Sequence, residues 1–171
     1  RQRQMCIRDS AYTSVARGFK AGGFNIDGTL DGDLREFDEE YLIEYEAGFK
    51  GSLFENNLQL RLAIFKDDRR DQQVKSSIVR PRPDGSTEFI DFLGNAAEGT
   101  NKGLETSISW EINPHWRLTF DAGLLKATFD QYTNEFGENL SGRDQAHAPR
   151  YMASAGIRFS HGRWKATLTA D

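Results

Sequence analysis

The sequence predicts an all-β fold, an antiparallel up-and-down transmembrane β-barrel segment with about seven strands of a larger barrel. The first observation is strict alternation in two adjacent runs, 103–112 and 116–125, which are separated by one short turn. Apolar residues such as Leu104 and Trp110 lie on one side, and polar residues such as Glu105 lie on the other. A period of two residues is typical of a β-strand. Each run exceeds the roughly 5 to 6 residues of an ordinary soluble strand and matches a tilted bilayer span of about 9 to 11 residues.

Aromatic residues beside each short turn provide the second observation. The amphipathic rings of Trp and Tyr, and the aromatic girdles of barrels in general, lie at the membrane-water interface. We therefore expect an interfacial girdle on one rim of the barrel. Its predicted members are Phe49, Phe54, Trp110, Trp116, Phe159 and Trp164.

The third observation is that long and short connections alternate along the chain. Further strands are predicted at 11–20, 41–50, 58–65, 151–159 and 164–170. Short turns are expected at 51–57, 113–115 and 160–162, and long polar loops at 21–38, 76–93 and 130–148. Outer-membrane barrels combine short periplasmic turns with long extracellular loops. A soluble antiparallel sandwich also has alternating strands, and the girdle favours the barrel over it.

Composition agrees with a barrel and excludes several other classes. Hydrophobic residues make up 37% of the 171 residues, and the mean hydropathy is -0.66, as expected when only alternate positions face lipid. No run approaches the 18 or so apolar residues of a transmembrane helix. The net charge of -4 and the scattered basic residues make nucleic acid an unexpected partner. The single Cys6 predicts neither an internal disulfide nor a zinc site.

The N-terminal stretch, residues 1–10, fits no strand and contains no apolar segment of a signal peptide. We interpret it as an atypical, artefactual stretch, and we assign residues 11–171 to a partial outer-membrane barrel domain. Because an outer-membrane protein must be exported, this pattern predicts a fragment of a longer chain.

The reactive side chains form no catalytic pattern. His115 and His161 are predicted at periplasmic turns and His147 at the opposite end, so no shared metal site is expected. The carboxylates of Asp67 and Asp68 are expected to belong to a solvated strand end rather than to an acid-base pair. The sequence predicts no enzyme and no cofactor.

Ligand binding is the favoured function, because recognition residues usually lie on loops that a rigid scaffold supports. Basic residues near the outer loops would attract an anionic chelate, and aromatic residues would cover a planar or apolar ligand. The candidates are Arg17, Lys20, Phe24, Arg80, Arg82, Phe89, Phe92, Tyr132, Phe136 and Arg143.

Four short motifs resemble the barrel of TonB-dependent outer-membrane receptors. They are YTSVARGFKAGGFN at 12–25, YEAGFKG at 45–51, NAA at 95–97 with GLE at 103–105, and AP at 148–149 before a strand. The segment between NAA and GLE is longer here than is usual in the family. The N-terminal plug, the TonB-contacting box and the terminal aromatic strand of the family are absent from this sequence.

The resemblance implies an energy-coupled importer of a scarce ligand such as an iron-siderophore complex. It implies location in the outer membrane of a Gram-negative bacterium, with outer-membrane lipid, TonB and a plug domain as partners. A passive porin-like barrel and a soluble β-rich binding module are the alternatives. Charged residues on the polar strand faces are expected to contact a plug or one another.

Overall fold

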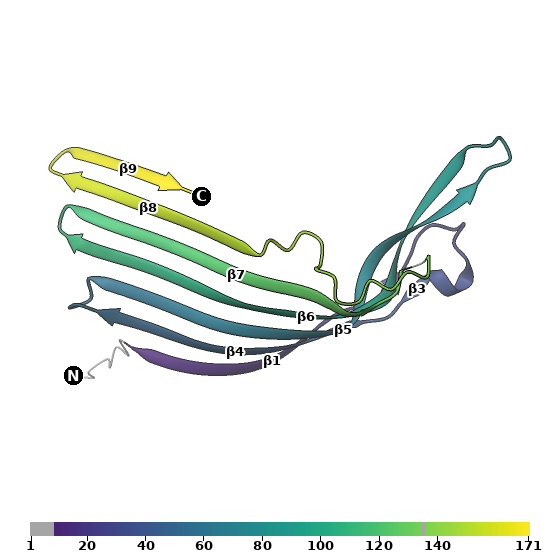
Figure 1. Ribbon diagram of the computed structural model, residues 1–171, viewed down its shortest axis with the longest axis horizontal. Helices are drawn as coiled ribbons and strands as arrows, with labels where there is room; N and C mark the ends of the chain where they lie inside the picture. Colours follow the sequence, from purple (N-terminus) through teal and green to yellow (C-terminus); the bar gives the residue numbers. More distant parts are fainter. Residues whose placement is uncertain (1–8, 135) are drawn as a thin grey trace.

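A computed structural model describes residues 9–134 and 136–171 and contains one curved seven-stranded antiparallel sheet (Figure 1). Its strands are β1 (Ser10–Lys20), β4 (Glu40–Leu53), β5 (Leu58–Pro81), β6 (Thr87–Asn113), β7 (Trp116–Tyr132), β8 (Tyr151–His161) and β9 (Trp164–Ala170), adjacent in sequence order. The predicted up-and-down topology is therefore confirmed. Of the stretch predicted as atypical, residues 1–8 lie outside the described residues.

The strand register places the apolar faces of all strands on the same side. Ile108 of β6 pairs with Leu60 of β5 and with Phe120 of β7, which in turn pairs with Ala155 of β8. A slip of one residue between any two strands would move one apolar set to the other face. The large apolar side chains on this outward face are exposed, and Leu168, for example, is 71% exposed.

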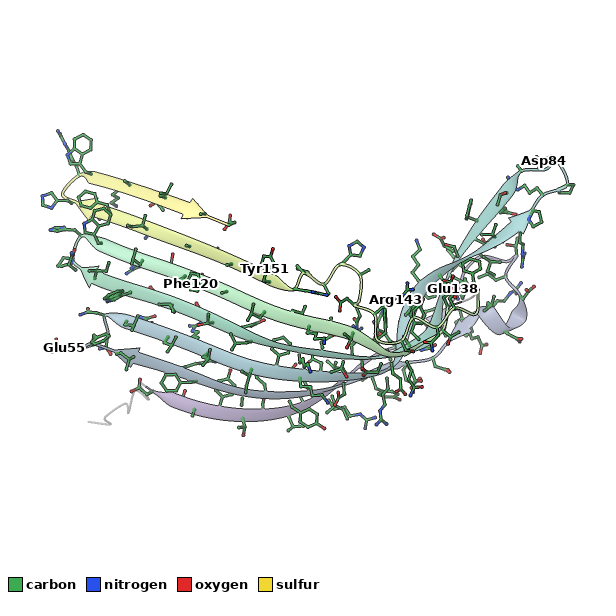
Figure 2. All side chains as sticks on the ribbon, viewed as in Figure 1. Glu55, Asp84, Phe120, Glu138, Arg143 and Tyr151 are labelled. Carbon is green, nitrogen blue, oxygen red and sulfur yellow. The ribbon has the colours of Figure 1, made fainter. Side chains whose placement is uncertain are left out.

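The loop predicted at 76–93 is wrong, because this segment is the end of a long hairpin between β5 and β6. Both strands continue through this segment, with Ile78 opposite Ile90 and Pro81 opposite Thr87. The Pro and Gly residues that suggested a loop form only its tip, where Arg82 N donates to Ser86 O at 2.8 Å. Figure 1 shows the hairpin projecting beyond the other strands, with Asp84 at its tip in Figure 2.

The connection between β1 and β4 is more ordered than the polar loop predicted at 21–38. It contains the short strand pair β2 (Gly23–Phe24) and β3 (Glu36–Phe37) and the 3-10 turn η1 (Gly32–Leu34). Leu30 of this connection is 3% exposed and packs with Ile90 and Phe92 of β6. The buried apolar cluster of the described residues thus lies between this connection and the long β5–β6 hairpin.

The third predicted loop begins after β7 ends at Tyr132, rather than at residue 130. It folds back onto that strand through isolated bridges, Thr133 to Asn139 and Thr128 to Asp144. In the part of the chain that the structure describes, no helix is long and apolar enough to span a membrane.

Candidate functional site

A groove of about 980 Å³ follows the concave side of the sheet and is lined by polar and apolar residues of the strands. The polar residues that line it include Tyr12, Glu46, Lys50, Arg61, Glu105, Ser107, Asp121 and Ser154. They come from β1 and β4 through β8, and each occupies the face opposite the apolar one. The predicted division into an apolar face and a polar face is therefore present in these strands.

Two glycines leave room for aromatic rings of neighbouring strands on the concave face. A Cβ atom at Gly48 would overlap the ring of Tyr12, and one at Gly103 would lie 2.6 Å from the ring of Phe65. The Lys50 ammonium group lies 5.0 Å from the centroid of the Tyr12 ring. Glycine within a strand often marks such a close approach. These contacts fix large side chains on the concave face.

An ion pair with a buried carboxylate lies at the outer end of the sheet, where β5 bulges. Glu40 is 5% exposed and forms a salt bridge with Arg69. Its second carboxylate oxygen accepts a hydrogen bond from Gln73 N at 3.1 Å. Asp71, at the bulge, has a positive φ of 53° and interrupts the pairing with β6. The bulge turns the long hairpin away from the line of the other strands.

Side-chain amides fasten the β1–β4 connection to this hairpin. Asn25 Nδ2 donates to Leu93 O at 2.8 Å, and its Oδ1 accepts from Leu93 N at 2.9 Å. Asn95 makes the equivalent reciprocal pair with the backbone of Asp38, at 3.0 and 2.7 Å. Gln73 Nε2 donates to Ala21 O at 3.0 Å. Local sequence patterns did not reveal the role of these amides, because each bonds to a backbone group 52 or more residues away in the sequence.

A family model for the β-barrel of TonB dependent receptor-like proteins matches residues 8–170. The chain belongs to this family. It is 30% identical over 146 residues to the pesticin receptor of Yersinia pestis, which covers 85% of this chain and 20% of that receptor. A pesticin receptor of Yersinia enterocolitica is 29% identical over the same length. The chain therefore spans about a fifth of the length of these relatives.

Solved structures of similar fold agree with this family assignment. The ferric yersiniabactin uptake receptor of Yersinia pestis has a TM-score of 0.68 and 24% identity, covering 96% of this chain and 23% of that one. The siderophore receptor PiuA of Acinetobacter baumannii has a TM-score of 0.63 and 19% identity, covering 89% and 22%. At these identities the likeness shows the fold alone: the seven strands are arranged like part of each of these larger chains.

The aromatic candidates for ligand contact have different surroundings in this receptor sector. Phe24, Phe89 and Phe136 are 72%, 70% and 67% exposed, so their rings are available to a ligand. Phe92 is 8% exposed because it packs against Leu30 and Ile90. The Tyr132 ring packs on Phe129, with 4.7 Å between the ring centroids.

The basic candidates divide in the same way. Arg80 donates to Thr29 O at 2.6 Å and so joins the long hairpin to the β1–β4 connection. Arg82 forms a 2.9 Å ion pair with Glu88 within the hairpin. Lys20 lines a polar hollow of about 390 Å³ on the inner face. Arg17 lies on the outward face, 5.0 Å from the centroid of the Tyr41 ring. Arg143 lies in the connection after β7 (Figure 2).

Hydroxyl and ammonium donors surround three carboxylates of the outer segments. The Thr29 hydroxyl donates to Asp27 at 2.6 Å and lowers its pKa, and the Ser86 hydroxyl does the same for Asp84 at 2.7 Å. Lys75 and the Ser77 hydroxyl lower the pKa of Asp91. The lowered pKa values favour the ionised form of these carboxylates, which accept hydrogen bonds in two turns and in the long hairpin.

The predicted girdle residues lie in or beside the strand ends at the three short turns, and Figure 2 marks this end of the sheet with Glu55. Trp116 and Phe159 are register partners, and their ring centroids lie 4.8 Å apart. Trp164 is 67% exposed on the same outward face. The two faces and the two ends of the sheet are therefore chemically distinct.

Proposed function

We propose that this chain is a sector of an outer-membrane active-transport receptor that binds and imports a scarce ligand such as an iron-siderophore complex. Energy from the inner membrane would reach the barrel through TonB and an internal plug. The observation that carries this proposal is the common register, which puts the apolar strand faces on one side of the sheet and the polar faces on the other. Family membership supports it independently.

The two edge strands of the sheet need further strands to pair with before a closed barrel can form. β1 and β9 each have one paired neighbour within the described residues. An unpaired backbone group in hydrocarbon costs several kcal/mol, so strands cross a bilayer as a closed barrel. Further strands of the complete receptor would pair with both edges, and a plug would occupy the concave groove. We propose residues 11–171 as part of one barrel domain on this basis.

Ligand recognition would take place at the outer end, between the long hairpin and the two long connections. The exposed rings of Phe24, Phe89 and Phe136 offer apolar contact there, and Lys20 and Arg143 offer positive charge. The more firmly engaged Arg80, Arg82, Phe92 and Tyr132 would support these contacts from behind. Arg17 lies on the outward face, so it would attract an anionic ligand from the rim of the barrel and not from the groove.

A transport assay of the complete receptor tests this function. Cells that depend on this receptor for iron should take up a labelled ferric siderophore, and a protonophore that collapses the inner-membrane gradient should abolish uptake. The triple change of Phe24, Phe89 and Phe136 to alanine should weaken ligand binding, while Phe54→Ala at the opposite end should leave it unchanged. Uptake that persists without energy would identify a passive porin-like barrel instead.

A further inference from the structure

Two histidines from separate short turns meet at the girdle end of the sheet. His115 lies in the turn between β6 and β7, and His161 is the last residue of β8. Their Nδ1 atoms are 3.4 Å apart, and the ring centroids are 4.5 Å apart with the planes at 72°. Both side chains are exposed, so the space beside the two nitrogens is open to solvent.

The backbone around this pair holds the two turns together. Ser160 N donates to His115 O at 2.8 Å, and Asn113 Oδ1 accepts hydrogen bonds from the N–H groups of His115 and Trp116 at 2.9 and 3.1 Å. His115 also rests near the ring of Phe159, with the centroids 6.4 Å apart. These contacts hold the two turns against each other and orient the imidazole of His115.

The spacing of the nitrogens fits one metal ion between them. Imidazole nitrogens bind zinc at about 2.0 to 2.1 Å, and two ligands at a tetrahedral angle are then about 3.3 to 3.4 Å apart. Imidazole suits Zn²⁺, Cu²⁺ and Ni²⁺, whereas aspartate and water suit harder ions. We propose that His115 and His161 form a two-histidine site for a late divalent transition-metal ion, which would link the β6–β7 turn to the β8–β9 turn.

Binding of a metal ion at this pair would require the proton on Nδ1 of His115 to move. In the tautomer of His115 that carries its proton on Nδ1, this nitrogen donates to Ser160 O at 3.0 Å. A metal needs the Nδ1 lone pair, so that proton moves to Nε2 through solvent and the bond to Ser160 breaks. No group of three or more His, Cys, Asp or Glu suited to a metal occurs among the described residues. Water therefore completes the coordination, and moderate affinity is expected.

This site is distinct from the proposed binding of a ferric ligand. The pair lies beside the girdle, whereas the ligand candidates Phe24 and Phe89 lie at the other end of the sheet. His147, the third histidine, lies in the connection after β7 and has a positive φ of 59°. It therefore provides a control remote from the pair.

Titration of the complete receptor with CuCl₂ or ZnCl₂ tests the site. The protein is purified in detergent without a histidine tag and with Cys6→Ser, which removes the one thiol of this chain. His115→Asn and His161→Asn should each weaken the site about tenfold or more, since even indirect disturbance of a metal site costs about 10- to 100-fold. His147→Asn should change nothing.

The electron paramagnetic resonance spectrum of the Cu²⁺ form gives a second readout. Hyperfine coupling to two imidazole nitrogens is expected in the parent protein and to one in His161→Asn. Each variant is first checked for the heat resistance of a folded barrel. Affinity that is equal in the parent and both variants, or a spectrum with one imidazole in the folded parent, would overturn the site whatever the result of the transport assay.

Discussion

Ile108 and Phe120 are register partners on the outward face, while the preceding Ser107 pairs with Asp121 on the concave face. Neighbouring positions of one strand therefore have opposite environments. In a complete barrel the first pair would face lipid, and the second would face the lumen.

This relationship predicts unequal effects of an arginine at adjacent residues. In the complete barrel, Ile108→Arg should lower the free energy of unfolding by about 2 to 4 kcal/mol, because it places a charge near the bilayer midplane. Ser107→Arg should cost much less, since its side chain would lie in the polar groove. Reversible denaturant unfolding in lipid vesicles measures both. Equal losses would contradict the assignment of the two faces.

The contact between Gly48 and Tyr12 predicts a specific glycine requirement. Gly48→Ala should destabilise the barrel by about 1 to 3 kcal/mol, because a Cβ atom there overlaps the Tyr12 ring. The loss should shrink in a Tyr12→Ala background. Gly123→Ala is the matched control, since a Cβ atom at Gly123 meets nothing within 4 Å. A double-mutant cycle by denaturant unfolding gives the coupling, and a cycle that is additive would contradict the contact.

The buried cluster of Leu30, Ile90 and Phe92 predicts that a cavity there would destabilise only the outer segments and not the whole sheet. Ile90 is 2% exposed and packs with Leu30, so Ile90→Ala should release the β1–β4 connection from the long hairpin. Burial of this kind contributes about 2 to 5 kcal/mol. Hydrogen exchange of residues 23–37 should accelerate, while exchange in β7 should not change. Phe89→Ala, one position away and exposed, serves as the control. Accelerated exchange in both variants would indicate that packing at Ile90 is not the cause.

Acid should weaken the long hairpin through Asp91. Lys75 and the Ser77 hydroxyl hold the pKa of Asp91 below its usual value of 3.8. A carboxyl group with a lowered folded-state pKa adds stability above its unfolded pKa and loses it as pH falls through the folded one. Amide exchange near Asp91 should therefore rise only below about pH 3.8 relative to Asp91→Asn. In that variant this acid step should be missing, and a step that persists would assign it to another group.

The sequence by itself determined the strands, the two faces and the short turns. Each depends on local information, such as the two-residue period around Ile108, the girdle at Trp110 and Trp116, and the turn predicted at 160–162, which the structure has at 162–163. It also placed His115 and His161 at the same end of the barrel. The long hairpin was wrongly predicted as a loop, because the turn residues near Gly85 outweighed the apolar residues at Ile78 and Ile90.

Tertiary structure alone decided which distant residues meet. The bulge at Asp71 re-aims the hairpin, so that Ile90 reaches Leu30 and Asn25 reaches Leu93. The 3.4 Å approach of His115 to His161 likewise follows from the pairing of β7 with β8. A period of two residues specifies the face of a side chain but not the register or the bulge that sets its neighbours. For that reason, the polar contacts of the outer end and the histidine pair required the folded sheet.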